Sequence, residues 1–547
     1  MGKNTTSSSI GVIRSECPVC GESLDCPLGG HIRSQHGEKE FKQVVLEAKA
    51  KGMLDKEIGM LFGVTFRQLE KIITEAYGIN ISALKKPKII KYWEPRNFKE
   101  ETTTVWSFKQ RGDWATHNGM YRGNWTPYIP RNVILKYSNP GDIVLDYFVG
   151  SGTTAVEAKL LGRRCIARDI NPACIALTRE NLNFNIPATL FEKYPSLFEP
   201  EASVGDARDL SDIQDNSVDL ICAHPPYAGI ISYSTKIDGD LSQLPVGEFL
   251  KEMIKVARES YRVLKPCGKC AILIGDTRKR KHVVPIGFRI INIFLNEGFK
   301  LKELVIKRQH NCKATGFWYE KSIKYNFLLL AHEYLPTFEK PKANPSPVVS
   351  VEEKEASYTI VTPVLENLVL KKDLDKFETT TVWIFPKENF EEQLNKNVID
   401  RYSQNRNYTV ITFTHCSKNK ANFATTRDGQ NRCNTELLFV KALFCDNSFS
   451  SSKEIGDCLN KITEAVRQEL SNIQRGGFLV IQTKDIRINE HIEPIAIKLV
   501  DALAYDALWL KEIVVVVQEG KNQNHSNNPT ECLKIVHQYL LVYEVKK

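Results

Sequence analysis

Apolar and polar positions along this 547-residue chain alternate in the manner of a parallel α/β sheet over most of its length. From Glu101 to Pro336, short apolar runs typical of buried strands are separated by segments with helical periodicity. The same alternation returns from Tyr358 to Lys547. The pattern therefore predicts a doubly wound α/β sheet in the middle of the chain and a second α/β domain after it.

Changes in composition predict where the domains begin and end. Polar, Lys- and Pro-bearing residues follow the first 80 positions, and the later segment PTFEKPKANPSPVVSVEEKEAS has the composition of a linker. We expect five segments: a small module at 1–80, a linker at 81–100, a main domain at 101–335, a second linker at 336–357 and a last domain at 358–547.

The last domain repeats parts of the main one. ETTTVWSF at Glu101–Phe108 recurs as ETTTVWIF at Glu378–Phe385, and NVILKYS recurs as NVIDRYS. Further matches, from Gly268 and Gly477 onward, share a single offset of 209 residues. Several collinear matches indicate a diverged internal duplication rather than chance, with a second copy that is shortened before Gly477.

A glycine-rich turn carries the most informative chemistry. A predicted strand, Ile143–Phe148, runs into the turn VGSGTT, and a helix is expected to begin at Ala155. Gly150 and Gly152 have no Cβ, so a ligand can approach the backbone at the start of that helix. Asp169 follows the next predicted strand, where an acid in such a fold accepts hydrogen bonds from ribose hydroxyls. For GxG alone, a tight turn without a ligand is the alternative.

The turn favours an adenosyl cofactor that has no phosphates. A phosphate-binding loop would have the pattern GxxxxGK[ST], and no Lys stands at that place here. A dinucleotide-binding loop would have a third Gly where this chain has Ala155. We therefore expect S-adenosyl-L-methionine as the cofactor.

A second turn, His224-Pro225-Pro226-Tyr227, follows the predicted strand Val218–Cys222. The two prolines end the strand because they cannot donate to the sheet ladder. The turn is then expected at the carboxyl edge of the sheet, beside the cofactor crevice. Outward carbonyl groups and the ring of Tyr227 would suit a planar base that bears an amino group. A half-buried Tyr after a plain turn is the alternative.

These two turns resemble the cofactor loop and the catalytic loop of the DNA methyltransferases that modify adenine N6 or cytosine N4. DYFVGSGTT and HPPY carry the resemblance, and NSVDLICAHPPY and YRVLKPCGKCAILIGD are similar to the flanking segments of that family. The similarity extends from about Thr102 to Tyr334. Two features differ, because the family usually has Asp, Asn or Ser in place of His224, and many members place PPY before the Gly-rich loop.

The resemblance implies a Rossmann-like methyltransferase fold and roles for individual residues. The methionine end of the cofactor would be bound by Asp146, Phe148, Gly150 and Gly152, and Thr153 is counted with these cofactor-binding residues. Asp169 would bind the ribose and Asp206 the adenine amino group. The flipped target base would be held by His224, Pro225, Pro226 and Tyr227. The segment Trp125–Arg131 would close the cofactor pocket from below. If His224 accepts a hydrogen bond from the base, activity should fall as the pH drops below its ordinary pKa, near 6.5.

The first 40 residues contain a candidate metal site. Cys17, Cys20, His31 and His36 have the spacing C-x2-C-x10-H-x4-H, which fits a tetrahedral, structural zinc ion. The middle gap is two residues shorter than in DNA-reading zinc fingers, and Cys26 could replace one ligand. A few unconnected Cys and His on a loop are the alternative.

Residues 51–78 have the pattern of a helix, a turn and a second helix. Asp55 is expected to cap the first helix, Gly63 supplies the turn, and Thr65 caps the second helix. This resembles a helix-turn-helix whose second helix would lie in a major groove of DNA. DNA contacts are expected from Arg67, Gln68 and Lys71 in that helix and from Arg278, Lys279 and Arg280 in a later basic run. A plain helical hairpin and a solvated loop are the alternatives.

Composition narrows the remaining possibilities. The net charge is +9 from 74 basic and 65 acidic residues, which permits a nucleic-acid partner without requiring one. The 14 Cys are scattered, so a reducing, cytoplasmic setting is expected rather than a disulfide framework. The chain has no run of about 20 apolar residues that would span a membrane.

Together the motifs predict an enzyme that transfers a methyl group from S-adenosyl-L-methionine to adenine N6 or cytosine N4 in double-stranded DNA. An RNA substrate and a DNA-binding regulator with a vestigial methylase fold are the alternatives. The second copy has neither a GxGTT loop nor PPY between Ser403 and Gly477, so we expect it not to bind the cofactor.

Overall fold

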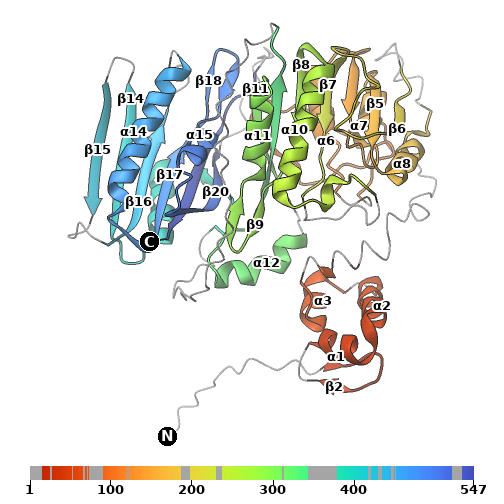
Figure 1. The fold of residues 1–547 in the computed structure, drawn as a ribbon, viewed down its shortest axis with the longest axis horizontal. Coiled ribbons are helices and arrows are strands. Elements are labelled where there is room, and N and C mark those ends of the chain that lie inside the picture. The colour runs from red at the N-terminus through yellow and green to blue at the C-terminus, as the bar shows by residue number, and fades with distance from the viewer. Residues whose placement is uncertain are drawn as a thin grey trace.

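The computed structural model describes residues 15–24, 27–51, 53–65, 68–69, 72, 90–119, 121, 123–185, 197–228, 237–310, 313–342, 378–416, 420–428, 434–444, 449, 451–519 and 532–546. Three parts can be followed in Figure 1: an N-terminal module (15–72), a middle unit (90–342) and a C-terminal unit (378–546). None of the helices within these ranges is long and apolar enough to cross a membrane.

The middle unit is built on an eight-stranded sheet with the strand order β3-β11-β12-β8-β7-β4-β5-β6. Neighbouring strands are parallel, except that β12 runs antiparallel to both β11 and β8. The strands are β3 (Val105–Ser107), β4 (Ile143–Asp146), β5 (Arg164–Asp169), β6 (Glu201–Val204), β7 (Val218–Ala223), β8 (Leu264–Ile272), β11 (Lys300–Arg308) and β12 (His332–Glu339), with a separate hairpin of β9 (Thr277–Lys279) and β10 (His282–Val284).

Helices cover both faces of this sheet. They are α6 (Tyr128–Tyr137), α7 (Thr153–Leu160), α8 (Pro172–Leu182), α10 (Val246–Val263) and α11 (Ile286–Asn296), with a short 3-10 helix η1 (Leu241–Gln243). A further helix, α12 (Lys313–Lys324), lies apart from these faces, beside the N-terminal module (Figure 1). Buried residues of α10 and α11 belong to one hydrophobic core and those of α6 and α7 to another. The adjacent residues Val144 and Leu145 of β4 face different cores, because successive side chains of a strand point to opposite faces. The predicted doubly wound, Rossmann-like α/β fold is confirmed.

The C-terminal unit has a seven-stranded sheet with the order β13-β20-β21-β17-β16-β14-β15. Six of these strands follow the order of β3, β11, β12, β8, β7 and β4 in the middle unit, so the repeat in the sequence is also a repeat in topology. The elements are β13 (Val382–Pro386), α13 (Phe390–Tyr402), β14 (Tyr408–Cys416), β15 (Lys420–Asp428), β16 (Thr435–Leu443), α14 (Ser452–Leu470), β17 (Ile473–Thr483), β18 (Ile486–Ile488), β19 (His491–Glu493), α15 (Ile495–Ala502), β20 (Leu508–Glu519) and β21 (His537–Val545).

The two units differ at the strand that follows β4 and β14. In the middle unit, β5 is parallel to β4, and helix α7 forms the crossover between them. In the C-terminal unit, β15 pairs with β14 in antiparallel register from Tyr408–Asp428 to Cys416–Lys420. An antiparallel hairpin needs no crossover helix, so this unit has no counterpart of the Gly-rich turn that leads into α7 among the residues described.

A short segment of each unit pairs with the backbone of the other unit. Thr103 forms a parallel bridge with Lys534, and Thr380 forms the equivalent bridge with Leu329. Beyond these bridges, the hydroxyl of Thr104 lies 2.8 Å from Nδ1 of His537. The repeated ETTT sequence therefore pairs, in both copies, with the opposite unit.

Two arginines reinforce this exchange. Arg278 of β9 binds Glu512 and donates to the Lys511 carbonyl at 3.0 Å. Arg487 of β18 binds Glu303 at 2.5 Å in the same manner. Both glutamates are fully buried, so each buried charge of one unit is neutralised by an arginine of the other.

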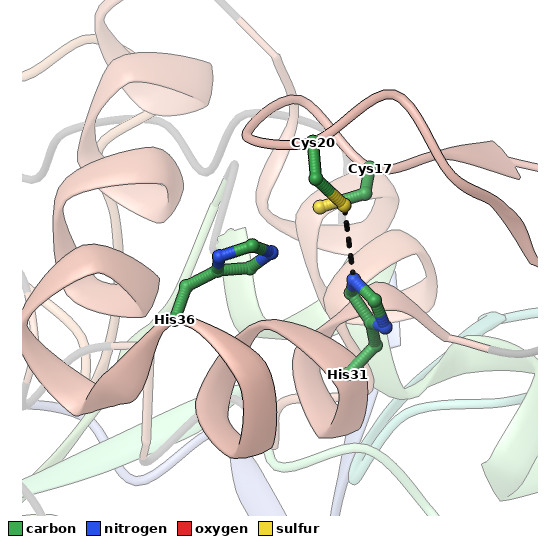
Figure 2. Close-up of side chains that lie close together, drawn as sticks. All are labelled: Cys17, Cys20, His31 and His36. Atoms are coloured by element: carbon green, nitrogen blue, oxygen red, sulfur yellow. Dashed lines mark hydrogen bonds between the residues drawn. The ribbon is translucent and has the colours of Figure 1, made fainter.

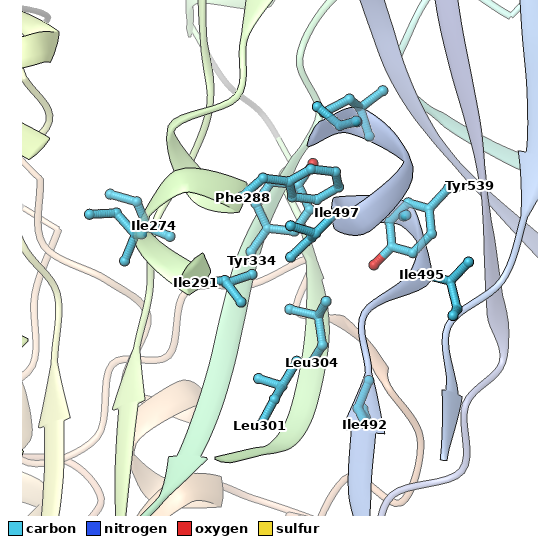
Figure 3. Packing of buried hydrophobic residues seen from close by; sticks show 14 of the residues in the cluster. Ile274, Phe288, Ile291, Leu301, Leu304, Tyr334, Ile492, Ile495, Ile497 and Tyr539 are labelled. Carbon is cyan, nitrogen blue, oxygen red and sulfur yellow. The ribbon is translucent and has the colours of Figure 1, made fainter. Parts of the chain in front are cut away.

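A single hydrophobic core joins the two units between these ion pairs. It includes Phe288 and Tyr334 of the middle unit together with Ile497 and Tyr539 of the C-terminal unit, as Figure 3 shows. The rings of Phe288 and Tyr539 meet edge to face with centroids 6.1 Å apart. The units thus share a core as a domain does, rather than touching along a polar surface.

The N-terminal module is a small helical cluster. It contains β1 (Ser15–Glu16), β2 (Ser23–Leu24), α1 (Leu28–Gln35), α2 (Gly37–Ala50) and α3 (Asp55–Phe62), packed around Phe41 and Ile58. Asp55 is the first residue of α3 rather than its cap, and Glu57 accepts a hydrogen bond from the Leu54 N–H at 2.9 Å. Gly63 ends α3 in the left-handed conformation, as predicted.

Both predicted linkers are shorter than the sequence indicated. Residues 90–100 pack on the middle unit, where Glu94 pairs with Arg131 at 2.9 Å and Trp93 contacts Phe184. Strand β12 continues through Pro336, the predicted start of the second linker, to Glu339. Proline is accepted there because the ladder between β12 and β8 is interrupted between Tyr334 and Thr337. Residues 81–89 and 343–357 lie outside the described residues.

Candidate active site

The Gly-rich turn connects β4 to α7 at the carboxyl edge of the middle sheet. Gly150 has a φ of +54°, and a Cβ there would lie 3.0 Å from the ring of Tyr121. Gly152 has a φ of +89°, and a Cβ there would lie 3.0 Å from Thr178. Both positions favour glycine, because the left-handed backbone and the close neighbour each disfavour a side chain. The backbone of the turn is thereby kept open toward the crevice.

Asp146, at the end of β4, stabilises this turn through hydrogen bonds to its residues. It accepts hydrogen bonds from the Phe148 N–H at 2.9 Å and from the Thr154 hydroxyl at 2.5 Å. Burial raises the pKa of the Asp146 carboxyl to about 7. Thr153 is also buried, and its hydroxyl donates to Asn124. Among the predicted cofactor residues, Asp146, Gly152 and Thr153 therefore shape the loop.

Asp169 ends β5 and faces the crevice. One of its oxygens accepts from the Gly150 N–H and the other from the Asn171 N–H, each at 2.9 Å. Burial raises the pKa of the Asp169 carboxyl to about 6, although both hydrogen bonds act in the opposite direction. The carboxylate is therefore tied to the Gly-rich turn and lies where ribose hydroxyls are bound in folds of this type.

The His224-Pro225-Pro226-Tyr227 turn follows β7 directly. The imidazole of His224 stacks on Trp125, with centroids 5.5 Å apart and planes 23° from parallel. Its Nε2 lies 3.3 Å from the Tyr227 hydroxyl. Burial lowers the pKa of His224 to about 4, so the imidazole is neutral well below the predicted value of 6.5. The expected fall in activity therefore moves to lower pH, a shift that the sequence alone could not show because the environment of the half-buried ring depends on the fold.

Two charged residues support Tyr227 from the neighbouring strands. Its hydroxyl donates to the carboxylate of Glu333 on β12. Lys307 of β11 binds the other oxygen of that carboxylate at 2.7 Å. Glu333 is 5% exposed, and despite its burial the nearby Lys307 and His224 lower its pKa to about 2. Sequence analysis missed both residues because they lie at least 80 positions from the turn and only the sheet brings them beside it.

A cleft joins the two turns. Its empty volume is about 770 Å³, including the open mouth. Predicted residues from both turns and from neighbouring segments line it: Trp125, Phe148, Gly150, Asp169, Asp206, His224 and Pro226. The sequence did not indicate Tyr121, Asn124, Cys174 or Asp240, which also line it. Both carboxylate oxygens of Asp206 are bound by the Arg208 guanidinium at 2.6 to 3.0 Å. A ligand would therefore share Asp206 with that arginine.

A buried network holds the wall that carries Trp125. Glu157 of α7 accepts from Trp114 and from the nearer ring nitrogen of His117, both at 2.7 Å. Arg131 donates to the other oxygen of Glu157 at 2.9 Å. Arg131, the last residue of the predicted closing segment, therefore anchors the wall instead of facing the cleft.

The residues predicted to contact DNA have different outcomes. Arg278 was interpreted wrongly, because its guanidinium is occupied by Glu512 across the interface between units. Lys279 and Arg280 are exposed at the end of the β9–β10 hairpin. Arg67 and Lys71 lie outside the described residues. The side-chain oxygen of Gln68 accepts from the Thr65 N–H at 2.8 Å while the Thr65 hydroxyl accepts from the Gln68 N–H, so Gln68 takes part in a capping box.

The four predicted metal ligands come together in the N-terminal module. One ligand atom from each of Cys17, Cys20, His31 and His36 lies within 4.8 Å of the others, and Figure 2 shows their side chains converging. His31 places Nε2 3.4 Å from the Cys20 sulfur and Nδ1 3.7 Å from Glu22. Nε2 of His36 is buried without a hydrogen-bond partner among the described residues. Cys26, the alternative ligand, lies outside those residues.

Comparisons with known proteins agree with the motifs. Residues 49–180 and 218–421 match the profile of an N6/N4 family described as DNA methylase. The type II methyltransferase M.BglII of Bacillus subtilis is 29% identical over 165 residues, which are 28% of this chain and 44% of that protein. M2.DpnII of Streptococcus pneumoniae, another type II methyltransferase, is 46% identical over 89 residues, 16% of this chain and 32% of that protein.

One further relative is named for a tRNA, and one solved structure aligns with part of the chain. A tRNA (guanine(10)-N2)-dimethyltransferase of Methanothermobacter thermautotrophicus is 35% identical over 132 residues, 24% of this chain and 34% of that protein. The crystal structure of TrmN from Thermus thermophilus aligns with a TM-score of 0.26 and 22% identity, over 40% of this chain and 50% of that one. The chain thus spans between about a third and a half of the lengths of the relatives it matches. The family profile, in contrast, covers more than half of this chain, and the chain belongs to the N6/N4 DNA methylase family.

Proposed function

We propose that this protein transfers a methyl group from S-adenosyl-L-methionine to adenine N6 or cytosine N4 of DNA. One observation carries the proposal: a single cleft at the carboxyl edge of the sheet is lined both by Gly150 and Asp169 and by His224 and Pro226. A cofactor held by the first pair would lie beside a base held by the second. Ligands of open α/β sheets bind at this edge.

The charges of the cleft suit this cofactor. Among the described residues that line it there are three aspartates, Asp169, Asp206 and Asp240, and neither lysine nor arginine. Such a lining favours a cationic nucleoside without phosphates over a nucleotide. The backbone at Gly150 would lie along the cofactor, Asp169 would accept from its ribose hydroxyls, and Asp206 remains our candidate for its adenine. When bound, the cofactor supplies a methyl group made electrophilic by a sulfonium.

The His224–Tyr227 turn would hold the target base outside the DNA stack. Pro225 and Pro226 fix the backbone so that carbonyl oxygens can accept from the amino group, and Tyr227 offers a ring for stacking. The cofactor would supply its methyl group for direct transfer to the amino nitrogen, with no covalent intermediate on the protein, and the proton released by the amine would pass to solvent. Positioning and acceptors for the amino hydrogens are therefore what the protein must contribute.

Analysis of nucleosides tests this function. The full chain is incubated with unmethylated duplex DNA and the cofactor, and the digested DNA is examined by mass spectrometry. We expect N6-methyldeoxyadenosine or N4-methyldeoxycytidine with the wild type and with Gln538→Ala in the C-terminal unit, but a large loss with Tyr227→Ala. Binding of the cofactor without either product would contradict the proposal. A tRNA arm is included because one relative is named for a tRNA, and methylated guanosine there would favour RNA as the substrate.

We also propose that the N-terminal module holds one structural zinc ion and contributes to DNA binding. The converging thiolates and imidazoles fit zinc, the unpartnered Nε2 of His36 would gain a partner, and Glu22 would orient His31 from outside. Arg67, Lys71, Lys279 and Arg280 remain the proposed contacts to DNA. Removal of residues 1–80 should leave cofactor affinity unchanged and weaken DNA binding. Undiminished DNA affinity in the truncated protein would contradict this role.

A further inference from the structure

A chain of hydrogen bonds runs from β11 and β12 to the imidazole that lines the cleft. Lys307 binds one oxygen of Glu333, and the other oxygen accepts from the Tyr227 hydroxyl. A phenol has one proton to donate, so when it donates to Glu333 its oxygen can only accept from a third group. That third group is His224, whose Nε2 lies 3.3 Å from the Tyr227 oxygen.

This direction determines the proton positions on His224. To donate to Tyr227, Nε2 must carry the ring proton, and in a neutral imidazole Nδ1 is then a bare acceptor. Among the described residues Nδ1 makes no hydrogen bond, while His224 lines the cleft. Stacking on Trp125 fixes the plane of the ring. The ring thus keeps one acceptor, in a fixed plane, on a residue that lines the cleft.

We propose that Glu333 and Lys307 are positioning residues that act through Tyr227 to fix the tautomer of His224, so that its Nδ1 accepts a hydrogen bond from the target amino group. The proposal rests on the function proposed above and deepens it. It also explains how a histidine can stand where related enzymes usually have an oxygen-bearing side chain. An oxygen is always an acceptor, whereas a histidine must be held in one of its two neutral forms.

The charged groups near His224 favour its neutral form. Burial is the main cause of the lowered pKa of His224, and Lys307 and Arg111 act in the same direction. Only Glu333 acts in the opposite direction. Because Lys307 keeps the Glu333 carboxylate ionised, Glu333 remains an acceptor for Tyr227 over the whole working range of pH.

The C-terminal unit provides an internal comparison. Lys307 and Glu333 face each other across β11 and β12, and the facing pair in β20 and β21 is Val516 and Gln538. Gly275 leaves room for the ring of Tyr227, 3.1 Å from where a Cβ would be, and the residue at the same offset of 209 is Lys484.

Other positions of the same strands are identical in the two units. Unchanged between them are the buried interface residues Glu303 and Glu512, His332 and His537, and Tyr334 and Tyr539. The unit without PPY has therefore kept the residues that hold the units together and lacks all three that surround Tyr227. This contrast links Gly275, Lys307 and Glu333 to Tyr227 rather than to folding.

The tautomer can be measured without any methylation assay. Protein labelled with 15N at histidine is examined by NMR at pH 7, where the two ring nitrogens of each tautomer have distinct shifts, and His224→Asn assigns the signal of His224. We expect the form protonated at Nε2 in the wild type and a mixture of forms in Glu333→Gln and Tyr227→Phe. A wild-type ring protonated at Nδ1, or an unchanged signal in Glu333→Gln, would overturn the proposal.

Turnover in two backgrounds then separates positioning from a merely structural role. Glu333→Gln should lower kcat about tenfold, the scale of one lost hydrogen bond, without changing cofactor affinity. In the His224→Asn background, whose amide oxygen is an acceptor by itself, the same substitution should have no further effect. Gln538→Ala, the matched position of the other unit, should not alter kcat. An equal loss in both backgrounds would overturn the proposal. Absence of methylation in every variant would refute the proposed function, and the NMR result would then decide whether Glu333 and Tyr227 fix the tautomer of His224.

Discussion

Cofactor affinity should depend on pH through Asp169. This carboxyl lines the cleft, and burial raises its pKa to about 6. The ionised form offers two acceptor oxygens, whereas the protonated form offers a hydroxyl that cannot accept in the same way. Cofactor binding should therefore be strongest above pH 6 and weaken as the pH falls below it.

The size of the effect follows from that pKa. A carboxyl with a pKa of about 6 is about 99% ionised at pH 8 and about 9% ionised at pH 5, so affinity should fall about 11-fold, or about 1.4 kcal/mol. Replacement by Asn removes the charge but leaves an amide oxygen. Asp169→Asn should therefore weaken binding by about 1–3 kcal/mol at pH 8 and reduce the pH-dependent step.

Isothermal titration calorimetry at several values between pH 5 and pH 8 measures both effects on the intact chain. Asp485→Asn is the matched control, because burial raises the pKa of Asp485 to about 7 but this residue lies in the C-terminal unit. It should keep the wild-type dependence on pH. Equal wild-type affinity at pH 5 and pH 8, or the same slope in Asp169→Asn, would refute the reasoning.

Four further outcomes are expected. Arg487→Met should lower the free energy of unfolding in urea by about 3–5 kcal/mol, because it leaves Glu303 charged and buried. Adding Glu303→Gln should restore part of this loss, whereas additive losses would contradict an ion pair between the two residues. Metal analysis should find about one zinc per chain and none after Cys17→Ser. With saturating cofactor, turnover should be lost near pH 4 and not near 6.5, because burial lowers the pKa of His224; an inflection at 6.5 would contradict this. Calorimetry should give one cofactor per chain, whereas two would show that the C-terminal unit also binds it.

The turns of the candidate active site could be predicted because their chemistry is local. Gly150, Gly152 and the two prolines after His224 act through their own backbone, so the sequence alone indicates the turn and the open crevice. The supporting residues Glu333 and Asp240 could not be predicted in this way. Each is an ordinary acid in the sequence and becomes part of the site only because the sheet and its loops bring it there.

The sequence also contains a signal for the role of Arg278. This residue lies in a run of five basic residues, which favoured a DNA contact. The same offset of 209 that reveals the repeat also aligns Arg278 with Arg487 and Glu303 with Glu512. A cation and an acid retained together in both copies indicate an ion pair between the copies, and the structure contains both pairs.

The reciprocal contacts explain why a copy without a cofactor loop is retained. Each unit completes the other, since the segments at Thr103 and Thr380 bridge to the opposite unit and each buried glutamate depends on the opposite arginine. Loss of the C-terminal unit would leave Glu303 unpaired and would expose the shared core of the middle unit to water. In the C-terminal unit a hairpin of β14 and β15 stands where the middle unit has the Gly-rich turn. This hairpin is at the end of the sheet away from the interface, so the replacement leaves the interface unchanged. The interface residues have no such freedom, and the candidate cleft is built on the sheet whose strand β11 contacts the second copy.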